Sequence, residues 1–337
     1  MAAGYPTAKR LSEMVANTSS HDFYIQAGNL CKRPETLPYQ KIELIPFENL
    51  LILIRGYSYA HCNQFDYEQF YDFYWKIWHI SDCFAGLELD KRIKELNGLY
   101  QQLVCFYLDE ADKRASLYIE QYEHFRDFIQ HAALADKVHI HTLNHDTLLE
   151  RILEGLYSDG FSTDNSLFTC EGGKIPMFSE DNYQGNILLY KLHGSLDRYR
   201  YTYQKDISKY EYIKIPSRSG INVESIRNQD DTDTSCLQCL IPDFLTGTTT
   251  KIQRYKEPFY QSQFEHFKEN LCSADIIYII GYGGRDDKIN EYLLAYAKGK
   301  SIYIIDPFSN EDLNRLSQNL GANVQIVQQY AEQYDFR

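Results

Sequence analysis

Polar residues that could do chemistry follow a predicted strand in the middle of the chain. Residues 137–143 are short, β-branched and apolar at alternate positions, which predicts a strand, and helical spacing begins at Thr147. Asn144 and Asp146 therefore lie at a strand-to-helix turn. In an open parallel sheet, ligands bind beyond the carboxyl ends of the strands, so this turn lies where such a sheet carries its chemistry.

A second predicted strand, residues 186–192, also ends in polar residues, and His193 is the first of them. An imidazole has an unperturbed pKa of about 6.5 and can act as a general base at neutral pH. Structural alternatives exist for each residue taken alone. Asp146 could simply cap the following helix, and a lone histidine at a strand end is more often structural. Two polar strand ends together favour a functional site.

These two motifs resemble those of sirtuins, which carry Gln-Asn-x-Asp and, further along, His-Gly. Here they read Leu-Asn-His-Asp at 143–146 and Leu-His-Gly-Ser at 192–195. The sirtuin-like proteins of bacterial antiphage defence are more similar still, because they continue into Thr-Leu-Leu-Glu and have Lys-Leu before the histidine. Residues 281–290 resemble the Gly-Tyr-x-Phe-x-Asp-x-His-Ile-Asn segment of that group, with Gly284 for Phe and Lys288 for His. Three motifs in the same order make the resemblance specific.

The resemblance implies an α/β fold, a doubly wound parallel sheet of the Rossmann-like sirtuin type with a large helical insertion. We expect residues 1–18 and 137–330 to form the NAD-binding core. Residues 19–136 are rich in aromatic residues at helical spacing and are interpreted as the helical insertion. Residues 197–250 are expected to form a small loop-rich insertion within the core. Buried-type apolar runs at 274–280 and 301–305 predict two more parallel strands.

The activity implied by the resemblance is cleavage of NAD at its nicotinamide–ribose bond. His193 would be the general base, Asn144 would orient the water or the ribose, and Asp146 would hold the nicotinamide carboxamide or the shape of its own loop. No catalytic metal is expected, and NAD is the substrate. The expected NAD contacts are Gly4, Tyr5, Pro6, Asp146, Gly281, Tyr282, Gly283 and Asp306.

The first residues depart from the family pattern. The segment Ala-Gly-Tyr-Pro-Thr at 3–7 resembles one that follows a strand and a Gly-Ala-Gly-x-Ser loop in sirtuin-like proteins, and neither precedes it here. Glycines of that loop let backbone N–H groups approach a pyrophosphate. The missing strand would be central, so its loss would expose unpaired edges on both neighbours. We expect Met1 to be an internal methionine of a longer chain or a mis-set start, the alternative being a degenerate protein that does not use NAD.

Two other functions stay open. Protein deacylation, as in true sirtuins, is disfavoured because those enzymes carry a zinc ribbon. Cys236 and Cys239 could form half of one, but no second pair lies about 15–20 residues away. The other alternative is a catalytically inactive nucleotide-binding or scaffold module, which the absent glycine-rich loop keeps open.

Composition restricts the class of protein and its partners. The 337 residues include 47 acidic and 34 basic ones, a net charge of −13, with no basic cluster, which disfavours direct nucleic-acid binding. No signal peptide or apolar run of about 20 residues is visible, so we expect a cytoplasmic protein that does not enter membranes. The resemblance further implies a homo-oligomer and a defence-system partner protein that senses infection.

Overall fold

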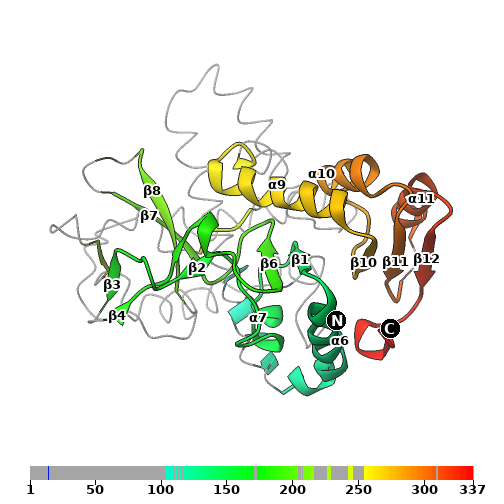
Figure 1. Ribbon diagram of the computed structural model, residues 1–337, viewed down its shortest axis with the longest axis horizontal. Helices are drawn as coiled ribbons and strands as arrows, with labels where there is room; N and C mark the ends of the chain where they lie inside the picture. The colour runs from blue at the N-terminus through cyan, green and yellow to red at the C-terminus, as the bar shows by residue number, and fades with distance from the viewer. Residues whose placement is uncertain are drawn as a thin grey trace.

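The architecture is mixed α/β, with parallel strands at its centre (Figure 1). The computed structural model describes residues 117–170, 173–203, 206, 208–215, 226–228, 242–245, 254–308 and 310–336, together with Met14 and part of 104–115. Gly4, Tyr5, Pro6, Cys236 and Cys239 lie outside the described residues, as does most of the predicted helical insertion.

Two of the predicted strands pair in parallel at the centre of the molecule. β1 (Val138–Thr142) runs beside β6 (Ile187–Lys191), with Thr142 opposite Lys191 at the carboxyl end of the pair. Every residue of β6 is buried, as expected for a strand covered on both faces. The turn that carries Asn144 and the residues that follow β6 therefore leave the sheet at the same edge.

The last third of the chain forms a second parallel sheet. β10 (Ile276–Ile280), β11 (Ser301–Ile305) and β12 (Val324–Val327) follow one another in that order. The sequence Ile-Ile-Tyr-Ile-Ile of β10 is almost wholly β-branched, which suits a strand. Gly281, directly after β10, donates its N–H to the carbonyl oxygen of Ile305 at 2.9 Å, which holds the two strand ends together.

Helices connect and cover these strands, and most have an identifiable start or stop. Pro258 occupies the first turn of α9, and Asn310 caps α11 by accepting a hydrogen bond from the N–H of Leu313. Asp286 caps α10 in the same way. The helices are α6 (Glu123–Ala135), α7 (Leu148–Ile152), α9 (Pro258–Ser273), α10 (Asp287–Tyr292) with its π-helical continuation η5 (Leu293–Ala297), and α11 (Glu311–Leu320).

Side-chain packing joins the two parallel sheets. Figure 1 shows α9 extending from the region of β6 to that of β10. Its Phe264 and Phe267 belong to one core cluster with Leu192, after β6, and Ile279, in β10. Within the described residues β1 pairs only with β6 and β10 only with β11, so each has one edge without a strand partner there. Ile276, at the start of β10, is 55% exposed.

Short antiparallel strands form a separate region. β7 (Arg198–Thr202) and β8 (Tyr210–Lys214) pair along their length, although the composition of residues 197–250 predicts loops. Polar and charged residues, Arg198 among them, occupy buried positions of these strands, so their sequence lacks the apolar pattern of a buried strand. The remaining short strands are β2 (Phe161–Ser162), β3 (Phe168–Cys170), β4 (Gly173–Lys174), β5 (Met177–Phe178) and β9 (Arg227–Asn228).

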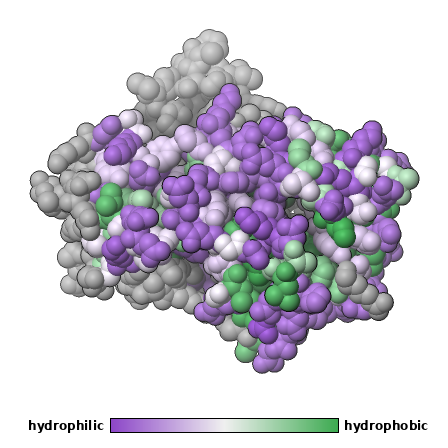
Figure 2. Space-filling model, in the orientation of Figure 1, coloured by the Kyte–Doolittle hydropathy of each residue, from purple (hydrophilic) through white to green (hydrophobic). Residues whose placement is uncertain are grey.

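Most of the face drawn in Figure 2 is hydrophilic, and apolar residues gather on it mainly over the region of α6 and α7. Leu134 on α6 is 84% exposed and Leu117, ahead of it, is 76% exposed. Among the described helices, none combines the length and the apolar character needed to cross a bilayer.

Candidate functional site

The Asn-x-Asp turn leaves β1 with its two polar side chains in different surroundings. Asn144 is exposed, whereas Asp146 is only 8% exposed. The Asp146 carboxylate accepts a hydrogen bond from the N–H of Leu148 at 3.1 Å and so satisfies one free N–H at the start of α7. The N-cap residue itself is Thr147, one position after Asp146. Burial raises the pKa of Asp146, and the nearby Lys191 ammonium and the Leu148 N–H oppose that rise.

His193 is 5% exposed, and its imidazole faces polar groups. Its Nε2 atom lies 3.2 Å from the hydroxyl of Tyr255 and 3.5 Å from Oδ2 of Asp286. The ring of His145, from the Asn-x-Asp turn, has its centre 6.5 Å from that of His193. A histidine with a carboxylate beside it can take up a proton, because the carboxylate stabilises the imidazolium that forms.

Asp286 performs two tasks with its two carboxylate oxygens. Oδ1 accepts the N–H groups of Lys288 and Ile289 and so caps α10, which leaves Oδ2 toward His193. The hydroxyl of Tyr282 bonds the backbone N–H and carbonyl of Asp286 and the side chain of Asn290. Tyr282 therefore shapes the loop that presents Asp286, and its role as an NAD contact stays a prediction.

The backbone around His193 is held by the segment 242–245. Leu245 donates its N–H to the carbonyl of His193 at 2.8 Å, and Ser195 donates to the carbonyl of Asp243. Gly194 has a φ of +82° between these contacts, a conformation that favours glycine. This close approach fixes where the chain turns after β6.

Asp243 anchors that segment with its side chain. It accepts hydrogen bonds from the hydroxyls of Tyr212 and Tyr260 and from the guanidinium of Arg254 at 2.7 Å. Burial works against its charge, but the Arg254 guanidinium and the three hydrogen bonds prevail and hold the pKa of Asp243 below its ordinary value of 3.8. Tyr255, which touches His193, follows Arg254 directly, so the network also positions the hydroxyl at the imidazole.

A pH-dependence of stability follows from Asp243. Because its folded-state pKa is depressed, its contribution is fully present above the ordinary value of 3.8 and is lost as the pH falls through the lower folded value. We expect the free energy of unfolding to fall in this acid range by about 1.4 kcal/mol per unit of pKa depression. Denaturant titrations at stepped pH check this: Asp243→Asn removes that part of the slope, and an unchanged slope in the variant would contradict it.

The two expected NAD-binding strand ends lie at the same edge. Gly281 has a φ of +64°, and a Cβ on it would meet no atom within 4 Å, so its backbone is open to close approach. Gly283 is similarly unobstructed, with Asn310 Nδ2 at 3.8 Å from such a Cβ. Asp306 is 9% exposed and accepts the N–H of Phe308 at 2.7 Å. The roles of Gly281, Gly283 and Asp306 as NAD contacts stay predictions.

Contacts connect several of the predicted residues, whereas Gly4, Tyr5 and Pro6 lie outside the described residues. The Lys191 ammonium bonds the carbonyls of Asn144 and Asp146, and His193, two positions after Lys191 in the chain, meets Asp286. Gly281 bonds the end of β11. A family model described as the SIR2-like domain matches residues 138–325, more than half of the chain. The chain belongs to the SIR2-like family. A search of curated proteins finds no match.

The SIR2-like domain also contains site residues that the sequence analysis did not assign. Asp286 lies within the 281–290 motif, Glu150 ends the Thr-Leu-Leu-Glu that follows the Asn-x-Asp turn, and Lys191 begins Lys-Leu-His-Gly-Ser. The family motifs therefore include these residues but do not indicate what they do. Tyr255 lies in no motif, and only its long-range contact with His193 reveals it. Among the described residues, no group of three or more His, Cys, Asp or Glu side chains is arranged to hold a metal ion.

Proposed function

We propose that this SIR2-like domain is an NAD⁺ hydrolase that cleaves the nicotinamide–ribose bond to give nicotinamide and ADP-ribose. The observation that carries the proposal is the position of His193. Its Nε2 faces the Asp286 carboxylate and the Tyr255 hydroxyl at the strand edge from which the Asn-x-Asp turn also emerges. Membership of the SIR2-like family supports NAD-related chemistry at that edge.

The leaving group determines what the site must provide. The nicotinamide of NAD⁺ carries a positive charge and departs neutral, so bond cleavage needs no general acid, unlike the hydrolysis of ordinary glycosides. The requirement is an oriented acceptor and stabilisation of an oxocarbenium-like ribose. In this proposal His193 takes the proton of the water or of a ribose hydroxyl, and exposed Asn144 orients that group. Asp146, bonded to the Leu148 N–H, keeps the turn in shape or holds the nicotinamide carboxamide.

Asp286 offers a prediction that separates folding from chemistry. Asp286→Asn keeps an oxygen for capping α10 but removes the charge beside His193, so we expect NAD cleavage to fall about tenfold with stability nearly unchanged. Asp286→Ala removes the cap as well and should lower the free energy of unfolding by about 1 kcal/mol. Turnover assays and denaturant curves on both variants check this. An Asn variant as active as the wild type would exclude a role for the charge.

The direct test is incubation of the purified full chain with NAD⁺. Nicotinamide and ADP-ribose are expected in equal amounts, without dependence on an acylated peptide. Turnover of an acetyl-lysine peptide with formation of O-acetyl-ADP-ribose would instead indicate a deacylase. Binding of NAD⁺ without cleavage, under every condition tried, would indicate a nucleotide-binding module.

We also propose that the domain acts in antiphage defence by NAD depletion, within a cytoplasmic homo-oligomer and with a partner protein that senses infection. The exposed Leu117 and Leu134 support an oligomer surface in the proposed insertion, residues 19–136. Residues 1–18 with 137–330 would form the NAD-binding core, and 197–250 its small insertion. Because a toxic NADase must be restrained, assays should include cell lysate from phage-infected cells as an activator.

A further inference from the structure

One buried lysine connects the two proposed catalytic motifs. Lys191 is the last residue of β6, two positions before His193, and its side chain is 1% exposed. Its ammonium donates hydrogen bonds to the carbonyl of Asn144 at 3.4 Å and to the carbonyl of Asp146. It also lies 3.0 Å from Oε1 of Glu150, one turn into the helix that follows. An ammonium has three N–H donors, and here three acceptors surround it.

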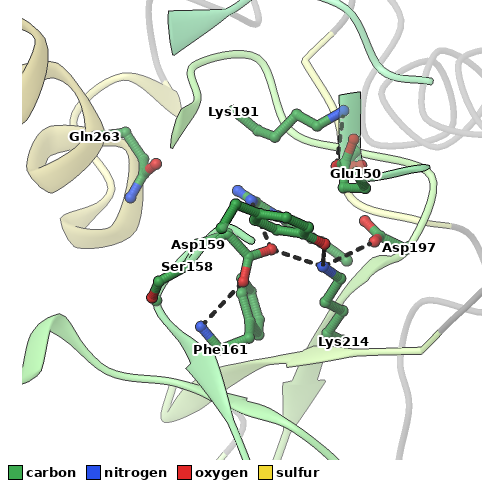
Figure 3. Close-up of polar contacts among 12 residues, drawn as sticks. Glu150, Ser158, Asp159, Phe161, Lys191, Asp197, Lys214 and Gln263 are labelled. Carbon is green, nitrogen blue, oxygen red and sulfur yellow. Dashed lines mark hydrogen bonds and ion pairs between the residues drawn. The ribbon is translucent and has the colours of Figure 1, made fainter. Parts of the chain in front are cut away.

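Glu150 gives the lysine its counter-charge. Figure 3 shows the Lys191 side chain reaching toward the Glu150 carboxylate. The contact is an ion pair at 3.0 Å, with both side chains buried. Burial raises the pKa of Glu150, while the charge of Lys191 lowers it. Burying both charges costs free energy, so the ion pair is weak evidence for stability. Its effect lies in holding the carbonyls of Asn144 and Asp146 in place.

We propose that Lys191, paired with Glu150, is a positioning residue that fixes the distance between the Asn144 amide and the His193 imidazole. The buried Lys191 ammonium bonds the carbonyls of residues 144 and 146, so these carbonyls point into the protein while the Asn144 side chain is exposed. The same residue fixes the start of the His193 segment through the β1–β6 ladder. The catalytic part of this inference rests on the proposed NAD hydrolysis, whereas the effect on the turn does not.

The test uses a double variant, because Lys191→Met alone leaves a buried unpaired carboxylate and could fail to fold. Replacing both partners of a buried ion pair with apolar residues is often neutral for stability. Lys191→Met/Glu150→Met should therefore keep its melting temperature close to that of the wild type, yet leave the two carbonyls untethered. A shift of about 1 Å in a reacting group can cost about 10²-fold in rate. We expect kcat for NAD to fall about 10- to 100-fold with KM little changed.

Hydrogen exchange gives a readout that does not need activity. In the double variant, amides of residues 143–149 should exchange at least about fivefold faster than in the wild type, while those of β6 keep their protection. Lys300→Met is the matched control, because the Lys300 ammonium also donates to two backbone carbonyls, those of Cys272 and Ala274, at 2.6 Å each. Those carbonyls lie at the end of α9 and not in the Asn-x-Asp turn, so exchange at 143–149 should stay as in the wild type.

The outcomes are separable. Faster exchange of the turn together with lower kcat supports the inference, and wild-type exchange or wild-type kcat in the folded double variant overturns it. If the wild type itself never cleaves NAD, the proposed function fails, and the exchange of residues 143–149 alone decides whether Lys191 positions the turn.

Discussion

Replacing His193 with alanine is expected to reduce NAD cleavage by about 10²-fold or more, because the proposed general base is lost. Asn144→Ala should have an effect of similar size, since the acceptor is no longer oriented. Asn144 is exposed, so its variant should fold normally. Initial rates of nicotinamide release, measured at saturating NAD, check both. In cells, expression of either variant should leave the NAD pool intact where the wild type depletes it.

A histidine outside the site provides the control for this experiment. His266 on α9 is paired with Glu180 at 2.7 Å, and the structure gives it no contact with His193. His266→Ala should therefore cleave NAD at close to the wild-type rate. Undiminished turnover in both His193→Ala and Asn144→Ala would show that other residues perform the chemistry, and equal losses in all three variants would point to a general effect on the fold.

Gly194→Ala is expected to destabilise the protein by about 3–5 kcal/mol, combining left-handed backbone strain with overpacking. A Cβ at this position would overlap the carbonyl oxygen of Asp243 and lie 2.6 Å from the Cα of Phe244 and 2.9 Å from the Tyr260 hydroxyl. These neighbours are backbone and a fully buried tyrosine, so they have little freedom to move. Any folded fraction should carry a displaced His193 and cleave NAD poorly.

Gly155→Ala separates the two causes of that loss. Gly155 has a similar φ of +74°, but a Cβ there would meet nothing within 4 Å. Only the backbone strain applies, so the expected loss is about 1 kcal/mol with activity retained. Chemical denaturation of the three proteins provides the comparison. Similar losses for the two variants would mean that the segment 242–245 does not press on the His-Gly turn.

The strands that carry the site could be predicted from sequence, because their runs of apolar side chains indicate burial. β6 and β10 are apolar runs with no charged residue except Lys191, and both form parallel strands. The sequence also predicts that Asp146 bonds the start of the following helix, and its carboxylate does accept the Leu148 N–H, although the N-cap residue is Thr147. Local rules suffice where the determining contacts are local in the chain.

The partners of His193 could not be predicted because their contacts cross large separations in sequence. Tyr255 belongs to an unremarkable stretch, and Asp286 reaches the imidazole only once β6 and β10 are brought together under α9. β7 was equally hard to predict, because Arg198 is fully buried and lies 3.5 Å from Asp159. A sequence pattern assigns charged residues to solvent unless their partners are known.

The separation of the two parallel sheets has a mechanical consequence. His193 follows β6 and Asp286 follows β10, and among the described strands no backbone ladder ties one to the other. Within the described residues, packed side chains and polar side-chain contacts, such as that between Asn270 of α9 and His141 of β1, resist a relative slide. Shear of about 1–2 Å between packed elements is a common way for proteins to switch. Assembly or partner binding that displaced one layer by that amount would make or break the imidazole–carboxylate contact. An enzyme built in this way can be stored switched off without unfolding any part of it.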